Sequence, residues 1–158
     1  MKYLVSDENW DVLGYRKYLE TIQHLFDTYT SEFILYKSFH DGYIKHLDLV
    51  NHFDENSEEE IEDPTSIRMI VMHSDGSLYE VVWSKVRRFF FDYDITRNVY
   101  SNLDEIVANG MRGIDEWGYD EILETDDKLI SHEIDLFSQT KIFIICKGVQ
   151  IKPYTEHI

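Results

Sequence analysis

Residues 66–83 read Ser-Ile-Arg-Met-Ile-Val-Met-His-Ser-Asp-Gly-Ser-Leu-Tyr-Glu-Val-Val-Trp, and no other part of the chain carries a stronger structural signal. Two apolar, alternating runs flank the pair Asp75-Gly76. An Asp-Gly pair in this setting favours a two-residue type I′ turn, because both central positions of that turn need a positive φ angle. The stretch therefore predicts a β-hairpin.

The turn also predicts how the two strands of this hairpin align. If Asp75 and Gly76 are the whole loop, one side of the ribbon carries the pairs Met72–Tyr79, Ile70–Val81 and Arg68–Trp83. We expect this side to face the core. Residues 84–95 predict a third strand, whose aromatic side chains alternate with charged ones.

The rest of the chain predicts more strands and two helices. Apolar residues recur at steps of three and four over residues 15–29 and again over residues 101–111, which is the helical period. Residues 43–53 fit a strand or a helix, and the preceding Asp41-Gly42 turn favours the strand. Further strands are expected at residues 32–39, 119–124, 131–137, 141–147 and 149–152. The predicted fold is a single α+β domain over residues 1–158, with a mainly antiparallel sheet and two helices.

Composition limits the functional classes. The chain of 158 residues has 31 acidic and 15 basic side chains, a net charge of −16, and a hydrophobic fraction of 43% that is typical of globular proteins. Such a charge repels nucleic acid and anionic membranes, and it attracts basic protein surfaces. The sequence has no apolar run of membrane-spanning length, and its single cysteine fits a reducing compartment. We therefore expect a cytoplasmic protein without nucleic-acid or membrane partners.

Two acidic segments are candidates for binding a basic partner. Residues 54–64 form an acidic loop that ends at Pro64, and residues 115–121 place charges around Trp117. An aromatic residue among charges is common in protein interfaces, although Trp117 could equally fill the edge of the core. The predicted partner-binding residues are Asp54, Glu55, Glu58, Glu59, Glu60, Glu62, Asp63, Asp115, Glu116, Trp117, Asp120 and Glu121.

No catalytic or cofactor motif is present in the sequence. His46, Asp48, His52 and Asp54 would share one face of a strand, but a straight strand separates His46 from His52 by about 20 Å, too far to share an ion. Cys146 lies in an apolar run, where burial makes a thiol unreactive. Phosphate-binding glycine loops, paired Cys-x-x-Cys motifs and nucleophile elbows are all missing. We therefore predict no catalytic residues, no metal, no cofactor and no enzymatic activity.

Residues 91–96 (Phe-Asp-Tyr-Asp-Ile-Thr), 115–121 and 131–134 (Ser-His-Glu-Ile) together give the second half of the chain a recognisable character. It resembles the small acidic α+β immunity proteins of bacterial polymorphic and contact-dependent toxin systems. The resemblance implies a cytoplasmic protein that binds and neutralises one cognate toxin domain, often a basic nuclease. It assigns no role to individual residues and no oligomeric state.

Two alternative functions come from other classes. A small-molecule-binding or metal-binding hydrolytic enzyme would have a deep pocket that holds several of His46, Asp48, His132 and Asp120. A generic adaptor would expose an apolar patch around residues 89–93.

Overall fold

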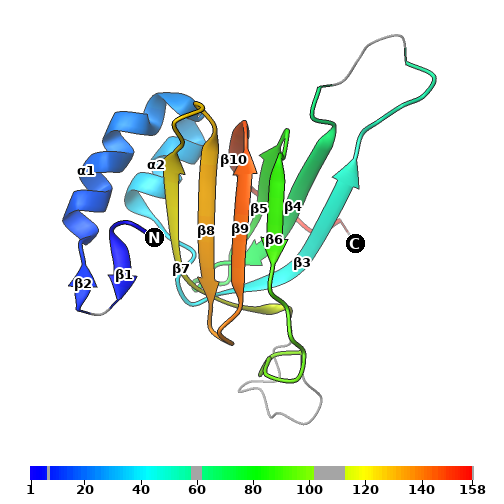
Figure 1. Cartoon of the computed structure of the whole chain (residues 1–158). Helices are drawn as coiled ribbons and strands as arrows, with labels where there is room; N and C mark the ends of the chain where they lie inside the picture. The colour runs from blue at the N-terminus through cyan, green and yellow to red at the C-terminus, as the bar shows by residue number, and fades with distance from the viewer. Residues whose placement is uncertain (7, 58–61, 102–112, 158) are drawn as a thin grey trace.

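The structure is a computed structural model that describes residues 1–6, 8–57, 62–101 and 113–157 (Figure 1). Within these ranges, two α-helices, one 3₁₀ helix and ten strands follow one another in this order: β1 (Leu4–Ser6), β2 (Asn9–Trp10), α1 (Val12–Ile22), a 3₁₀ helix (Gln23–Leu25), α2 (Thr28–Tyr36), β3 (Gly42–Asn51), β4 (Thr65–Met72), β5 (Leu78–Ser84), β6 (Arg88–Phe91), β7 (Asp115–Glu124), β8 (Ile130–Leu136), β9 (Lys141–Cys146) and β10 (Gly148–Pro153).

The main sheet has eight strands, all paired antiparallel, in the order β10-β5-β4-β3-β7-β8-β9-β6. Six of its strands form two meanders, β3-β4-β5 and β7-β8-β9, each built from neighbouring hairpins, and β10 and β6 lie at the two ends of the order. This arrangement confirms the predicted α+β class with a large antiparallel sheet.

The strands at the two ends of this order, β10 and β6, directly continue the strands β9 and β5 along the chain. β6 continues β5 after three residues, and β10 continues β9 after Lys147 alone. The four strands form one long antiparallel pair, because Lys147 N donates to Ser84 O at 3.2 Å and Arg87 N donates to Ile145 O at 2.8 Å across the junction. The sheet therefore curls strongly, and its concave side holds a core of large side chains that includes Trp83, Trp117, Ile67, Met69, Ile134 and Ile144.

The helices lie beside β7, where it is not paired with β3 (Figure 1). Tyr15 and Tyr18 of α1 place their hydroxyl oxygens at this edge, where each accepts a backbone N–H of β7 at 2.7 Å. α2 is fixed to β10 because Ile151 N donates to Thr30 Oγ1 at 2.9 Å. The helices thus satisfy backbone groups that an open sheet edge would leave unpaired. No helix in the described ranges is long and apolar enough to cross a membrane.

The predicted register of the central hairpin is wrong by one residue. Its loop has three residues, because His73 pairs with Ser77 through His73 N to Ser77 O at 2.8 Å, and Gly76 takes a φ of +88°. Met69 therefore faces Val81, and Ile67 faces Trp83. The inward residues of β4 are Ile67, Met69 and Val71, whereas Arg68 points to the other face and pairs with Glu80.

The predicted strand at residues 32–39 is also wrong, because most of it belongs to α2. The predicted helix over residues 15–29 ends earlier, and the chain turns after the 3₁₀ helix. Asp27 starts α2 as its N-cap by accepting Thr30 N at 2.8 Å. Phe33 and Leu35 are both buried, so the apolar residues of α2 do not follow a single helical stripe.

The remaining strands occur close to their predicted positions, including residues 43–53 as β3, except that β7 begins at Asp115 and not at Tyr119 as predicted. The third strand of the central region is shorter than predicted and pairs with β9. The predicted helix over residues 101–111 falls almost entirely on residues 102–112, which lie outside the described residues.

Candidate functional site

The ends of β3 and β4 extend beyond the rest of the sheet (Figure 1). We call residues 49–57 and 62–67 the hairpin arm. Three large apolar side chains of the arm are exposed: Leu49 (59%), Val50 (37%) and Phe53 (71%). Leu49 and Val50 are consecutive in β3 and point to opposite faces of the sheet, so the arm presents exposed apolar side chains on both sides. Single exposed apolar residues are common on proteins, but three within five residues are a concentration of the kind that contacts partners.

The acidic side chains of the arm fall into two groups. Asp54 and Glu55 are exposed beside Phe53. Glu62 and Asp63 instead form ion pairs at 3.1–3.3 Å with Arg87 and Lys147, which offset their charge. Glu58, Glu59 and Glu60 lie outside the described residues.

Asp63 fixes the base of the arm rather than its tip. Desolvation alone would raise the pKa of Asp63, but hydrogen bonds from Lys147 and Arg87 outweigh it and lower that pKa. Asp63 also has a positive φ of 53°, at the bend before β4. The ion pairs therefore hold the end of the acidic loop against the β5–β6 and β9–β10 junctions.

Within the part of the chain that the structure describes, β3 has a paired strand on only one side along the arm. β3 pairs with β7 only over Gly42–Ile44, whereas it pairs with β4 from Tyr43 to Asn51. Among the described residues, no strand pairs with the second edge of β3 beyond this point. An unpaired edge of this kind can accept a strand from a partner.

The second predicted acidic segment is largely inside the protein. The side chains of Asp115, Trp117 and Glu121 are at most 1% exposed, so these three residues form no acidic surface. The alternative reading of Trp117 as a core residue is confirmed. A role of the segment in partner binding stays a prediction, but these three side chains cannot contact a partner in this fold.

Asp115 is buried in a set of hydrogen-bond donors. Its Oδ1 accepts Glu116 N at 2.8 Å and the Ser138 hydroxyl at 3.1 Å, and its Oδ2 accepts Asn98 Nδ2 at 3.2 Å. Burial raises the pKa of Asp115 despite these bonds. Next to it, the Glu116 carboxylate accepts the Tyr100 hydroxyl, and burial followed by this carboxylate raises the pKa of Tyr100.

Glu121 holds the N-terminal segment of the chain. Its carboxylate accepts the backbone N–H groups of Lys2, Tyr3 and Leu4 at 2.5, 2.9 and 3.0 Å. These three bonds come from the backbone of a segment that is more than a hundred residues away in the sequence. The role of Glu121 in this structure is therefore internal.

Asp120 belongs to a buried polar chain that joins β5, β7 and β8. Trp117 Nε1 donates to Asp120 Oδ1 at 3.0 Å, His132 Nε2 lies 2.7 Å from Asp120 Oδ2, and Trp83 Nε1 donates to His132 Nδ1 at 3.0 Å. An indole N–H can only donate, so Nδ1 of His132 is the acceptor and its proton lies on Nε2. Every polar atom of this chain of four side chains has a partner.

A bulge at Gly118 brings Trp117 and Asp120 to the same face of the sheet. The register of β7 against β8 shifts between Trp117 and Tyr119. A Cβ atom on Gly118 would lie 2.6 Å from Asp135 O, so only glycine allows the two strands to approach so closely. Plain alternation along the strand would place Trp117 and Asp120 on opposite faces.

Within the described ranges, the histidines do not gather into a metal site, and the cysteine is buried. His46 Nε2 pairs with Asp48 at 2.8 Å, and His52 Nε2 lies 2.7 Å from the Ser66 hydroxyl. In the part of the chain that the structure describes, no three or more His, Cys, Asp or Glu residues gather as metal ligands. Burial raises the pKa of Cys146 to about 12, so its thiol stays protonated.

These features define an acidic α+β protein with an exposed hairpin arm and a buried polar chain. No protein-family model matches the sequence, and no curated protein matches it either. An uncharacterised protein from Neisseria gonorrhoeae of known crystal structure is similar at 13% identity and a TM-score of 0.45, over 74% of this chain and 95% of that one. At that level the likeness carries no argument about function.

Proposed function

We propose that this protein is a non-enzymatic inhibitor of the immunity type, which binds a cationic bacterial toxin domain through its hairpin arm. The observation that carries the proposal is the composition of the arm, where Leu49, Val50 and Phe53 are exposed next to Asp54 and Glu55. Apolar side chains bordered by one sign of charge match the usual interface plan of an apolar centre and a polar rim.

Charge supports a basic partner. With a net charge of −16, the protein attracts cationic surfaces over distances limited by the Debye length, about 8 Å at physiological salt. Such attraction accelerates encounter, and the apolar contact then determines how long the complex lasts. The charge surplus and the exposed apolar side chains of the arm thus have separate roles in binding.

A hydrolytic enzyme is the second candidate, because the fold brings Asp120 and His132 together at 2.7 Å. However, both ring nitrogens of His132 already have protein partners, and His46 and Asp48 lie elsewhere, on β3. A general base needs a nitrogen that can accept a proton from substrate or water. The hydrogen bonding of His132 therefore favours a structural role over a catalytic one.

The first experiment co-expresses this protein with the C-terminal domain encoded immediately upstream of its gene. We expect that domain to be basic and toxic, and its toxicity to disappear when this protein is present. A non-toxic neighbour, or toxicity that this protein does not relieve, would contradict the proposal.

The second experiment locates the interface by titration calorimetry on the purified pair. Replacing Asp54 and Glu55 by Lys should weaken binding at least about tenfold, about 1.4 kcal/mol. The matched control replaces Asp126 and Asp127 by Lys, which changes the net charge equally at another exposed loop. Equal losses in both double variants would mean that overall charge, and not the arm, determines affinity.

The apolar part of the arm has its own matched pair of variants. Phe53→Ser should raise the dissociation rate, whereas Phe137→Ser should not, since Phe137 is 60% exposed on the β8–β9 turn. An unchanged complex with Phe53→Ser would remove the arm from the interface.

A further inference from the structure

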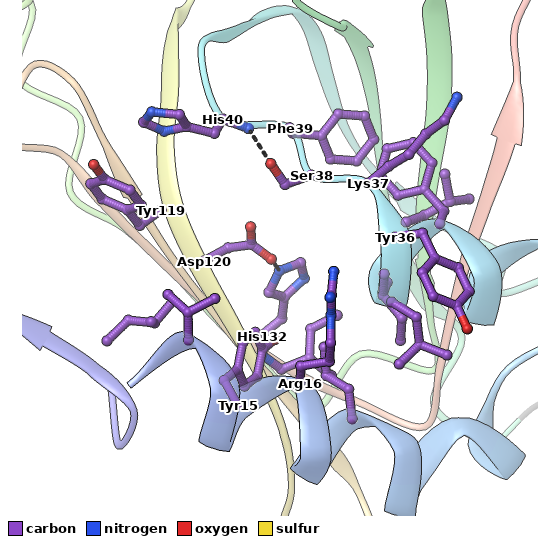
Figure 2. A pocket seen from close by; sticks show the side chains of 18 of the residues that line it. Tyr15, Arg16, Tyr36, Lys37, Ser38, Phe39, His40, Tyr119, Asp120 and His132 are labelled. Carbon is purple, nitrogen blue, oxygen red and sulfur yellow. Dashed lines mark hydrogen bonds and ion pairs between the residues drawn. The ribbon is translucent and has the colours of Figure 1, made fainter. Parts of the chain in front are cut away.

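A pocket of about 400 Å³ lies between the helices and the sheet, and none of its lining residues belongs to the hairpin arm (Figure 2). Its walls come from the N-terminal segment, α1, the stretch from α2 to His40, and strands β5, β7, β8 and β10. The volume falls within the range of pockets that bind small organic molecules. The pocket is independent of the function proposed above.

One wall of the pocket is an aromatic stack. The ring of His40 stacks on Tyr119 with centroids 4.7 Å apart and an interplanar angle of 18°, and Trp10 packs edge-on against Tyr119 at 4.5 Å. His40 is held in place because its Nδ1 lies 2.8 Å from Gly118 O. Much of the remaining lining is apolar and includes Leu19, Phe33, Phe39, Val81 and Ile151. Such walls fit an aromatic or branched aliphatic group.

The polar groups of the pocket differ in how many hydrogen bonds they already form within the protein. Asp120 forms part of the wall with His132, and its two carboxylate oxygens already accept bonds from Trp117 and His132 but retain further acceptor capacity. Arg16 extends from α1 into the space opposite them (Figure 2). Among the described residues, none forms a hydrogen bond or ion pair with Arg16, in a chain that has twice as many acidic as basic side chains.

We propose that this pocket binds a small aromatic or branched aliphatic carboxylate that also carries a hydroxyl or amino group. The carboxylate pairs with the guanidinium of Arg16, the apolar part lies against Tyr119 and Phe39, and the hydroxyl or amino hydrogen is donated to Asp120. Asp120 excludes ligands with several negative charges and no donor, because their anionic oxygens would face its carboxylate.

The test uses the full chain labelled with ¹⁵N and titrated with millimolar 3-phenyllactate, L-phenylalanine and 2-hydroxyisocaproate. We expect at least one of them to shift backbone amide signals of pocket residues. Phenyllactamide, which lacks the charge, should bind at least about tenfold more weakly than 3-phenyllactate if the latter binds. Shifts scattered over the surface, or no shifts with all three acids, would overturn the proposal.

Variants on α1 separate a specific pocket from general charge attraction. Arg16→Gln should weaken binding of the best acid at least about tenfold, and Lys17→Gln should change it less than about twofold. Both residues are exposed on the same helix, so both variants should fold, and both lose one positive charge. Equal affinity of the wild type and Arg16→Gln would refute the assigned carboxylate site.

Discussion

Glu121 offers the clearest test of whether the second acidic segment is internal. In Glu121→Gln, one carboxylate oxygen becomes an NH₂ group, and at least one of the backbone N–H groups of residues 2–4 then faces another donor. A buried donor without an acceptor costs about 1–3 kcal/mol. For a domain of this size that loss lowers Tm by about 2–4 °C per kcal/mol.

The assay is urea unfolding at neutral pH, combined with hydrogen exchange of the amides of residues 2–4. We expect Glu121→Gln to lower the free energy of unfolding and to speed exchange at those amides. The matched control is Glu20→Gln on the exposed face of α1, which should change stability by less than about 0.5 kcal/mol. If Glu121→Gln keeps full stability and slow exchange but loses partner binding, Glu121 is an interface residue and the internal role is refuted.

Three further predictions concern buried ionisable groups. Burial raises the pKa of Asp115, so the folded protein resists the ionisation of this carboxyl group. The wild type should therefore lose stability relative to Asp115→Asn as the pH rises from about 4 through the raised pKa. Urea titrations at several pH values measure this difference. Burial opposes ionisation of Glu80, but hydrogen bonds from Lys152 and Arg68 outweigh burial and lower the pKa of Glu80. Compared with Glu80→Gln, the wild type should therefore be more stable at neutral pH. Urea titrations should show that this difference disappears as the pH falls through the lowered pKa. Cys146 should react with Ellman's reagent in urea but not in the native protein, and fast native labelling would contradict its burial.

The strands could be predicted because their side chains alternate, but their exact alignment could not. An Asp-Gly pair suits a two-residue turn and also the end of a three-residue loop, where Gly76 alone takes the positive φ. The choice between a two-residue and a three-residue loop decides which side chains of β4 face the core. The side chains of residues 32–39 alternate as in a strand, which led to the wrong prediction there. The available signal for α2 was Asp27 three residues before Thr30, a helix N-cap.

The exposed acidic residues of the candidate sites could be predicted from the sequence, whereas the buried ones could not. Asp54 and Glu55 are exposed as their polar surroundings in the sequence predict. Asp115 and Glu121 are buried because distant segments supply their donors, and sequence spacing contains no information on those segments. The pairing of Asp120 with Trp117 depends on the bulge at Gly118, for which an isolated glycine within a strand was the available hint.

The long pair formed by β5–β6 and β9–β10 has a consequence for how the molecule assembles. Each meander forms through hairpins between strands that are neighbours in sequence. The long pair instead joins remote positions, such as Tyr79 with Pro153 and Phe91 with Ile142. Bringing such remote segments together costs loop-closure entropy before any contact compensates for it. We therefore expect the two meanders to form early and the long pair to form last. Formation of the long pair should then limit the folding rate, on a timescale of about milliseconds to seconds.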